Sequence, residues 1–267
     1  MIIDCHCHVS NKWYEPVESL LFQMDRNGVE QATLVQMLGV FDNNYQQECV
    51  SRYSDRFSSV VAVDVRQADA VEKLSRLAES GAIGVRLRPT DRSPGVDPYA
   101  IWRAADRLGL FVSCVGNSLQ FSSTDFSKVV AEFPSMPILL EHFGGTSSPD
   151  LTEEAKTLRS QVFQLNVYKN VILKIHGLGE IATRDQLMIG ESDESSRSLP
   201  QTLVDAIQSF GNSRLVWGSD FPVVSSREGY ANALKWSHQA IEKIAPDAVS
   251  NILGLTAKTL LSRTWKC

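Results

Sequence analysis

Short runs of apolar, often β-branched residues alternate eight times with amphipathic helical segments along this chain. Such an alternation predicts a parallel sheet, because the helix after each strand returns the chain to the same edge of the sheet. The predicted strands are Ile2–His6, Ala32–Gln36, Ser59–Asp64, Gly84–Arg88, Leu110–Val115, Ile138–His142, Val171–His176 and Leu215–Asp220. The predicted helices are Glu18–Asn27, Asn44–Tyr53, Ala68–Ser80, Tyr99–Leu108, Thr124–Phe133, Glu153–Tyr168, Pro200–Phe210 and Tyr230–Ala245.

Eight strand–helix units in 267 residues fit a closed (β/α)8 TIM barrel, formed as a single domain over residues 1–267. The rival architecture is an open doubly wound sheet, which would place a glycine-rich phosphate turn after its first strand. The first strand here leads instead into His6-Cys7-His8, and neither G-x-G-x-x-G nor G-x-x-x-x-G-K-[ST] occurs. We therefore expect neither a nucleotide nor another organic cofactor.

Charge and cysteine content narrow the class of protein further. A net charge of −5, with both signs well mixed, argues against nucleic acid or an anionic membrane as a partner. No apolar stretch approaches the roughly 20 residues of a membrane span, and the chain starts directly in a strand, so we expect no signal peptide and a cytoplasmic protein. A homodimer is left open.

The cysteines are odd in number and scattered, which predicts free thiols in a reducing compartment, at Cys5, Cys7, Cys49, Cys114 and Cys267.

The first strand ends in two histidines, His6 and His8, spaced i, i+2. Side chains two residues apart on a strand point to the same face, so both imidazoles are expected in one site. The same alternation places Cys5 and Cys7 on the outer face, toward the helices. Imidazole titrates near neutrality and is the commonest protein ligand for metals, which makes this pair the first candidate for a functional centre.

Polar side chains also stand at the ends of other predicted strands, where the active site of a TIM barrel lies. Four of the five histidines fall at strand ends, and only His238 lies inside a predicted helix, where we expect a surface or packing role. The strand-end candidates beyond the first strand are Gln36, Arg86, Arg88, His142, His176 and Asp220.

Each candidate also has a purely structural interpretation. Asp220 could cap a following helix, and His142 could be a core histidine satisfied by backbone groups. Arg86 and Arg88 could be ion-paired at the barrel rim, although two guanidinium groups aimed into a cleft suit a substrate carboxylate. Gly190–Ser198 is strongly polar and is predicted to form an exposed loop, with a role as a lid left open.

The chemistry expected of this set is hydrolysis. Asp220 is the candidate general base, because a carboxylate in a partly dry barrel mouth can have its pKa moved toward the working range. Two alternatives remain for the imidazoles. The imidazoles concerned are those of His6, His8 and His142. Together with Asp220 they could hold a divalent metal, of which Zn²⁺ is the first candidate. Without a metal they could hydrogen-bond the substrate carbonyl directly.

Three motifs carry a family resemblance: His6-x-His8 after an Ile-Asp strand, Glu141-His142-Phe143-Gly144-Gly145, and Trp217-Gly218-Ser219-Asp220-Phe221-Pro222. Together they resemble the amidohydrolase superfamily, and within it the amidohydrolase-related branch of small TIM-barrel hydrolases. That branch includes the sugar-acid and pyrone-dicarboxylate lactonases and, more distantly, aminocarboxymuconate-semialdehyde decarboxylase.

The resemblance implies a hydrolase that opens a lactone or related cyclic ester or amide of a small, carboxylate-bearing substrate. In that reaction Asp220, His142 and His176 are the catalytic candidates, and Arg86, Arg88 and Gln36 are the substrate-binding ones. The alternative function is a metal-dependent decarboxylase of an unsaturated carboxylic acid.

Two departures from the pattern of the superfamily bear on the metal and on His176. Metal-dependent members carry a further histidine on the fifth strand, and binuclear members a bridging lysine on the fourth, neither of which is found here. Lactonase relatives tend to have a small hydroxyl residue where this chain has His176. The resemblance therefore favours lactonase-type members, some of which work without metal, and leaves the role of His176 open.

Overall fold

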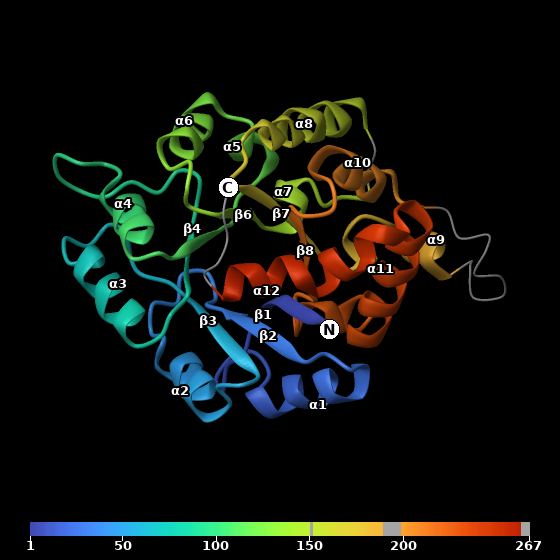
Figure 1. Ribbon diagram of the computed structural model, residues 1–267, viewed down its shortest axis with the longest axis horizontal. Helices are drawn as coiled ribbons and strands as arrows, with labels where there is room; N and C mark the ends of the chain where they lie inside the picture. Colours follow the sequence, from blue (N-terminus) through green and yellow to red (C-terminus); the bar gives the residue numbers. More distant parts are fainter. Residues whose placement is uncertain (150–151, 189–198, 263–267) are drawn as a thin grey trace.

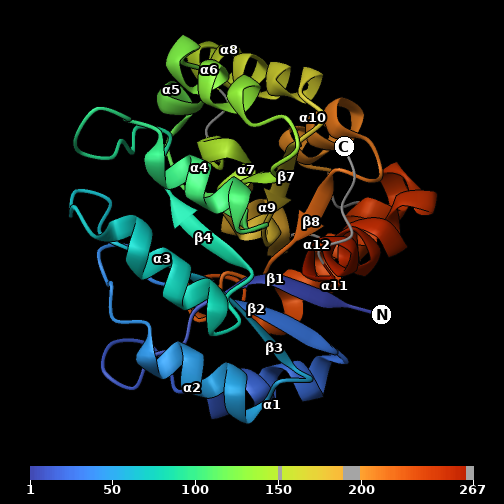
Figure 2. The same ribbon diagram turned by 60° about the vertical axis from the view of Figure 1, so that its left-hand side comes forward.

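Eight strands form one parallel sheet in chain order in the computed structural model, which describes residues 1–149, 152–188 and 199–262 (Figures 1 and 2). Each strand pairs in parallel with the next one along the chain. The predicted (β/α)8 barrel is therefore confirmed. The strands are β1 (Ile3–Cys7), β2 (Gln31–Val35), β3 (Phe57–Val61), β4 (Gly84–Leu87), β5 (Phe111–Cys114), β6 (Ile138–Leu140), β7 (Val171–Ile175) and β8 (Leu215–Trp217).

The helices surround the strands as an outer layer (Figure 2). The eight predicted from periodicity are α1 (Val17–Asn27), α2 (Asn44–Arg52), α3 (Ala70–Glu79), α4 (Ala100–Arg107), α6 (Thr124–Glu132), α8 (Glu153–Phe163), α10 (Gln201–Phe210) and α11 (Tyr230–Ile244). The predicted helix 153–168 ends early, because the chain tightens into the 3₁₀ turn η1 (Gln164–Val167). Helix α1 ends at Gly28, whose φ of 67° is left-handed, as expected of a glycine after a helix.

Several short elements were not predicted, because three to six residues are too few to show a period. They are α5 (Ser118–Phe121), α7 (His142–Gly145), α9 (Arg184–Met188), α12 (Thr256–Leu261), the 3₁₀ turns η2 (Leu178–Glu180), η4 (Val223–Ser226) and η5 (Pro246–Ala248), and the π-helix η6 (Asn251–Leu255). The polar loop predicted at 190–198 lies outside the described residues. No helix of the described ranges is long and apolar enough to cross a membrane.

The barrel closes where the residues after β8 meet β1. The His8 N–H donates to the Phe221 carbonyl at 2.7 Å, and the Asp220 N–H donates to the His6 carbonyl at 2.9 Å. The buried Asp4 carboxylate strengthens this edge, because it accepts a 2.8 Å hydrogen bond from the Ser219 N–H. The first and last strands thus carry His6, His8 and Asp220 to the same place.

The barrel interior is filled by one apolar side chain from most strands, and α12 packs against this cluster. The register of β1 against β2 shifts between Asp4 and Cys7, which interrupts simple alternation along β1. Cys5 consequently lies in the interior cluster, so its predicted outward position was wrong. Cys7 packs in the larger core with residues of α1, as predicted. The described cysteines, all but Cys267, are free and buried.

Candidate active site at the carboxyl end of the barrel

His6, His8 and Asp220 meet at the barrel mouth. The two Nε2 atoms are 3.2 Å apart, and Asp220 Oδ1 lies 3.7 Å from that of His6 and 3.5 Å from that of His8. All three residues are buried. His8 Nδ1 lies 2.7 Å from the Val35 carbonyl, which can only accept a hydrogen bond. Nδ1 of His8 therefore carries a proton, and its Nε2 faces Asp220 and the Nε2 of His6.

The spacing of these three donor atoms fits a divalent metal. Zinc binds imidazole nitrogen and carboxylate oxygen at about 2.0–2.1 Å, so neighbouring ligands of a tetrahedron are about 3.3–3.4 Å apart. The observed separations of 3.2, 3.5 and 3.7 Å bracket that value. Burial lowers the pKa of His6 well below its usual range, which favours the neutral imidazole that a metal requires. The residues present therefore fit the metal that the sequence suggested.

The backbone is left-handed at two of the three catalytic candidates, His142 and Asp220. His142 has φ 51° and Asp220 has φ 60°, and with Phe143 they are the only non-glycine residues of the described ranges with positive φ. Such conformations cost free energy for residues with a β-carbon and persist where the surrounding structure enforces them. These backbone conformations direct the side chains of His142, after β6, and Asp220, after β8, into the barrel mouth.

Asp220 is ionised at neutral pH. Burial alone would raise the pKa of its carboxyl group, but the hydrogen bond from His8 and the nearby histidines outweigh burial and lower that pKa. The predicted shift of this pKa toward the working range was therefore wrong in direction. The residue after Phe221 is Pro222, and η4 follows it, so Asp220 lies just before a 3₁₀ turn. The helix-capping role considered for Asp220 is partly supported, because the Val224 N–H donates to the Asp220 carbonyl. The Asp220 side chain, however, faces the histidines.

His142 forms a carboxylate–imidazole pair with Glu180 of η2. His142 Nδ1 lies 3.0 Å from Glu180 Oε1, and Arg227 Nη1 lies 3.0 Å from the same oxygen. Burial lowers the pKa of His142, but the hydrogen bond and charge of Glu180 more than offset it, so the net shift is upward. His142 Nε2 is left available for a substrate or an ion. His142 is about a quarter exposed, so it is reachable from the mouth.

His176 lies beside this pair. Its ring stacks on that of His142, with centroids 4.3 Å apart and planes 7° from parallel, and lies 4.9 Å from the ring of His6. Burial first, and the charge of His142 second, lower the pKa of His176 well below its usual range. Neither ring nitrogen has a hydrogen-bond partner among the described residues.

The floor of the site is a buried charge network that the sequence did not reveal. Lys174 Nζ donates to Ser113 Oγ at 2.9 Å and lies 3.0 Å from His6 Nδ1. Ser113 Oγ in turn donates to Glu141 Oε1 at 2.6 Å. Burial lowers the pKa of Lys174, although the charge of Glu141 opposes that shift. The network supports His6 from below.

Arg86 and Arg88 leave β4 differently. The Arg86 guanidinium forms a two-point buried pair with Glu141 at 2.7 and 3.1 Å and donates to the Gln36 carbonyl. Burial raises the pKa of Glu141, but Arg86 and Lys174 outweigh it and hold that pKa well below its ordinary value. Arg88 is exposed, and its N–H is bonded to Asp91 Oδ2.

Both arginines nevertheless line one pocket of about 300 Å³ at the carboxyl ends of β2, β3 and β4. Arg66, which is paired with Asp64, lines the same pocket. Gln36 contributes less directly, because its side-chain amide is bonded to Met37 N–H and the Asp42 carbonyl within its own loop.

The structure therefore gathers His6, His8, His142, His176 and Asp220 at one mouth. His238 lies apart on α11, 3.9 Å from Glu242, in the surface position predicted for it. Four charged residues of the site were missed by sequence reasoning. Lys174 is two residues before His176 in the predicted strand, so its inward orientation could have been predicted from alternation. No sequence signal marked Glu141 as the partner of Arg86. Nor did any signal mark Glu180 and Arg227 as residues of the site.

Comparison with known proteins agrees with this geometry. The chain is 25% identical over 244 residues to L-fucono-1,5-lactonase of Burkholderia ambifaria, covering 86% of this chain and 79% of that protein. Its fold is similar to a probable 2-pyrone-4,6-dicarboxylic acid hydrolase of Acinetobacter baumannii with citric acid bound (TM-score 0.72, 20% identity, 98% and 99% of the two chains). It is also similar to an amidohydrolase of Burkholderia multivorans with bound zinc (TM-score 0.78, 19% identity, 98% and 99%). Residues 3–263 match the amidohydrolase family, so this chain is an enzyme of the amidohydrolase superfamily.

Proposed function

We propose that this enzyme opens the ring of a small lactone, or a related cyclic ester or amide, that carries a carboxylate. The observation that carries the proposal is the contact of the ionised Asp220 with His6 and His8 beside a pocket lined by Arg86 and Arg88. Two similar proteins bear names that describe ring-opening hydrolysis, the L-fucono-1,5-lactonase and the probable pyrone-dicarboxylic acid hydrolase.

In the proposed reaction Asp220 takes a proton from the attacking water as the new C–O bond forms. The site stabilises negative charge on the former carbonyl oxygen, and the ring C–O bond then breaks. His142 is the proposed proton donor to the departing alkoxide, because Glu180 raises its pKa and holds its Nδ1. The product is the ring-opened hydroxy acid.

A divalent ion held by His6, His8 and Asp220 would supply Lewis-acid polarisation of the carbonyl and a more acidic water. His142, the further ligand expected from the sequence, keeps the donor role in this proposal, because a protonated imidazole has no lone pair for a metal. Without such an ion, the imidazoles of His6 and His8 would hydrogen-bond the carbonyl oxygen directly. Metal analysis of the purified enzyme, with activity before and after chelation, decides between these two forms.

Arg88 is the side chain best placed to bind the substrate carboxylate. The Arg86 guanidinium is already paired with Glu141. The contact of Arg88 with Asp91 is made by its backbone N–H and does not involve its guanidinium. A guanidinium grips a carboxylate with two parallel hydrogen bonds, which a lysine cannot reproduce. We therefore expect Arg88→Lys to weaken the binding of acidic substrates selectively.

The test is a panel of acidic lactones and neutral analogues of the same rings, followed through the acid released on ring opening. Arg88→Lys should raise KM for acidic lactones by the equivalent of about 1–3 kcal/mol and leave neutral ones nearly unchanged. Arg52→Lys on the exposed face of α2 is the matched control. Equal effects on both substrate types would reject the role of Arg88. Release of carbon dioxide without ring opening would favour the decarboxylase alternative.

A further inference from the structure

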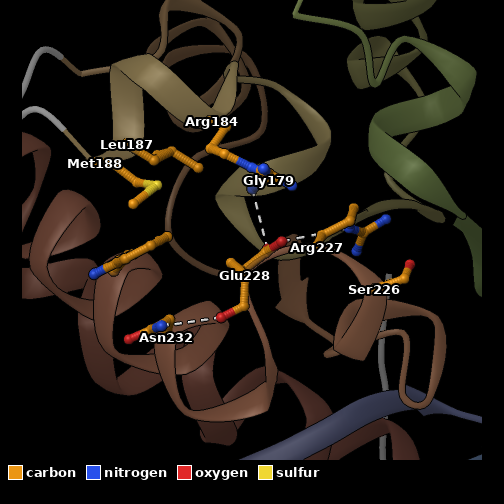
Figure 3. A pocket seen from close by; sticks show the side chains of 9 residues that line it. Gly179, Arg184, Leu187, Met188, Ser226, Arg227, Glu228 and Asn232 are labelled. Carbon is orange, nitrogen blue, oxygen red and sulfur yellow. Dashed lines mark hydrogen bonds and ion pairs between the residues drawn. The ribbon is translucent and has the colours of Figure 1, made fainter.

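A second pocket lies next to the barrel mouth, and the proposed reaction gives it no role. This pocket has a volume of about 320 Å³ and is formed by η2, α9 and the stretch from residue 226 into α11. Figure 3 shows the side chains of α9 on one side of it and those of Glu228 and Asn232 on the other. Among the described residues, its lining includes neither Asp220 nor any of the four histidines of the mouth. The pocket is therefore separate from the candidate active site.

Arg227 stands at the boundary between this pocket and the mouth. It lines the pocket, yet its Nη1 lies 3.0 Å from Glu180 Oε1 and 3.8 Å from Asp220 Oδ2. Its Nε lies 3.4 Å from Glu228 Oε2. Because three carboxylates surround this guanidinium, its positive charge is already balanced and does not draw a further anion into the pocket.

The Glu228 carboxylate is fixed in the wall of the pocket. Its side chain is 2% exposed, and its Oε1 accepts a hydrogen bond from the Gly179 N–H at 3.0 Å. A β-carbon on Gly177 or on Gly179 would overlap this carboxylate, so both positions need glycine to admit it. Glu228 therefore stays with Gly179 and Arg227 and is not free to neutralise another cation.

Arg184 is the cation of the lining that lacks a carboxylate partner within the described part of the chain. It is the first residue of α9, and its side chain is exposed. An unpaired guanidinium beside a pocket can hold a carboxylate with two parallel N–H···O hydrogen bonds. Since the charges of Arg227 and Glu228 offset each other, Arg184 gives the lining a net positive charge that favours an anionic ligand.

The pocket also has an apolar wall. Leu187 is buried in this wall, Trp236 is 8% exposed, and Met188 is about half exposed. A hydrocarbon group that covers the wall gains roughly 25 cal/mol for each Å² of apolar surface removed from water. A small anion without such a group would leave the wall in contact with water, so the lining suits a ligand with both an anionic end and an apolar body.

We propose that this pocket binds a small organic acid with an apolar body. The carboxylate of the acid pairs with the Arg184 guanidinium, and its hydrocarbon packs against Leu187, Met188 and Trp236. The inference does not depend on lactone hydrolysis, because the pocket lies outside the residues assigned to that reaction.

Isothermal titration calorimetry of the full chain tests the two ends of the ligand separately, with hexanoate, acetate and 1-hexanol as probes. Hexanoate should bind at least about tenfold more tightly than acetate, which lacks the hydrocarbon, and than 1-hexanol, which lacks the charge. Arg184→Gln should weaken hexanoate binding at least about fivefold and leave 1-hexanol binding unchanged. Met188→Gln should weaken hexanoate binding about fivefold, because it removes part of the apolar wall.

Both substitutions replace exposed side chains of α9, and an unchanged thermal midpoint would show that the fold is intact. Arg76→Gln on the exposed face of α3 is the matched control and should bind hexanoate like the wild type. Arg88→Lys, in the other pocket, should do the same.

Three results would each overturn the proposal. They are hexanoate binding no tighter than acetate, hexanoate binding that Arg184→Gln and Met188→Gln leave unchanged, and hexanoate binding that only Arg88→Lys abolishes. The readout is binding without turnover, so failure of this proposal leaves the lactonase assignment untouched.

Discussion

Asp220 combines a left-handed backbone with an ionised carboxylate in contact with two imidazoles. Asparagine accepts that backbone conformation well but cannot take a proton. Asp220→Asn is therefore expected to lower kcat by about two to four decades, the usual worth of a general base, with little change in the thermal midpoint. Turnover close to wild type would remove Asp220 from the proposed mechanism.

Glu180 sets the protonation of His142, because its charge outweighs burial and raises the pKa of that imidazole. The proposed donor is the protonated form, so activity should fall as the pH rises through this raised pKa. Glu180→Gln keeps the shape but removes the charge, and the fall should then begin at a lower pH. The measurement is kcat against pH, with Glu242→Gln beside the surface residue His238 as the control. An unchanged basic limb would show that His142 is not the donor.

Arg86 is predicted to matter more for stability than for substrate binding. Its removal would leave Glu141, which is fully buried, without its principal counter-charge. Breaking a buried pair from one side costs about 3–5 kcal/mol. We expect Arg86→Met to lower the free energy of unfolding in urea by that amount. Arg103→Met, which breaks exposed ion pairs with Glu132 and Asp97, should cost far less, and equal losses would contradict this account.

At the scale of elements, the contact between β1 and the segment after β8 depends on Gly218. A β-carbon at this position would lie 2.6 Å from the β-carbon of His6, which no packed structure tolerates. Gly218→Ala should therefore displace His6 and reduce both turnover and zinc binding by the proposed His6–His8–Asp220 site. Wild-type turnover in this variant would show that β1 can move aside without disturbing the site.

The elements themselves were largely predictable. Short apolar runs located all eight strands, because strands of a parallel barrel are buried on both faces, and period-3.6 patterns located eight helices, because each of these buries one face. Cys5 was misplaced because alternation cannot anticipate the register shift in β1. The strand-end rule found the histidines and Asp220, since every parallel strand ends at the same mouth. Glu180 and Arg227 escaped it because they lie on 3₁₀ turns and loops, whose positions depend on tertiary packing.

At the scale of the whole molecule, the barrel closes at one seam, the contact between β1 and the residues after β8, and Asp4 stabilises that seam. Burial raises the pKa of this carboxyl group, although Ser219, His6 and Tyr230 all donate hydrogen bonds to it. Tyr230→Phe removes the donor that α11 supplies and should cost about 1–3 kcal/mol of unfolding free energy. Chemical denaturation measures that loss. A variant as stable as the wild type would mean that the Asp4 carboxylate is already satisfied by the backbone.

The seam between β1 and β8 also bears on how the enzyme is made. Asp4 and Ser219, which join the two edges, are 215 positions apart in the chain. During synthesis His6 and His8 leave the ribosome more than 200 residues before the opposing carboxylate of Asp220. Pairing over such a separation is a late and slow event in folding. Chains that stop before Asp220 lack the proposed general base, so we expect them to be inactive. The appearance of activity during synthesis would then report closure of the barrel between β1 and β8.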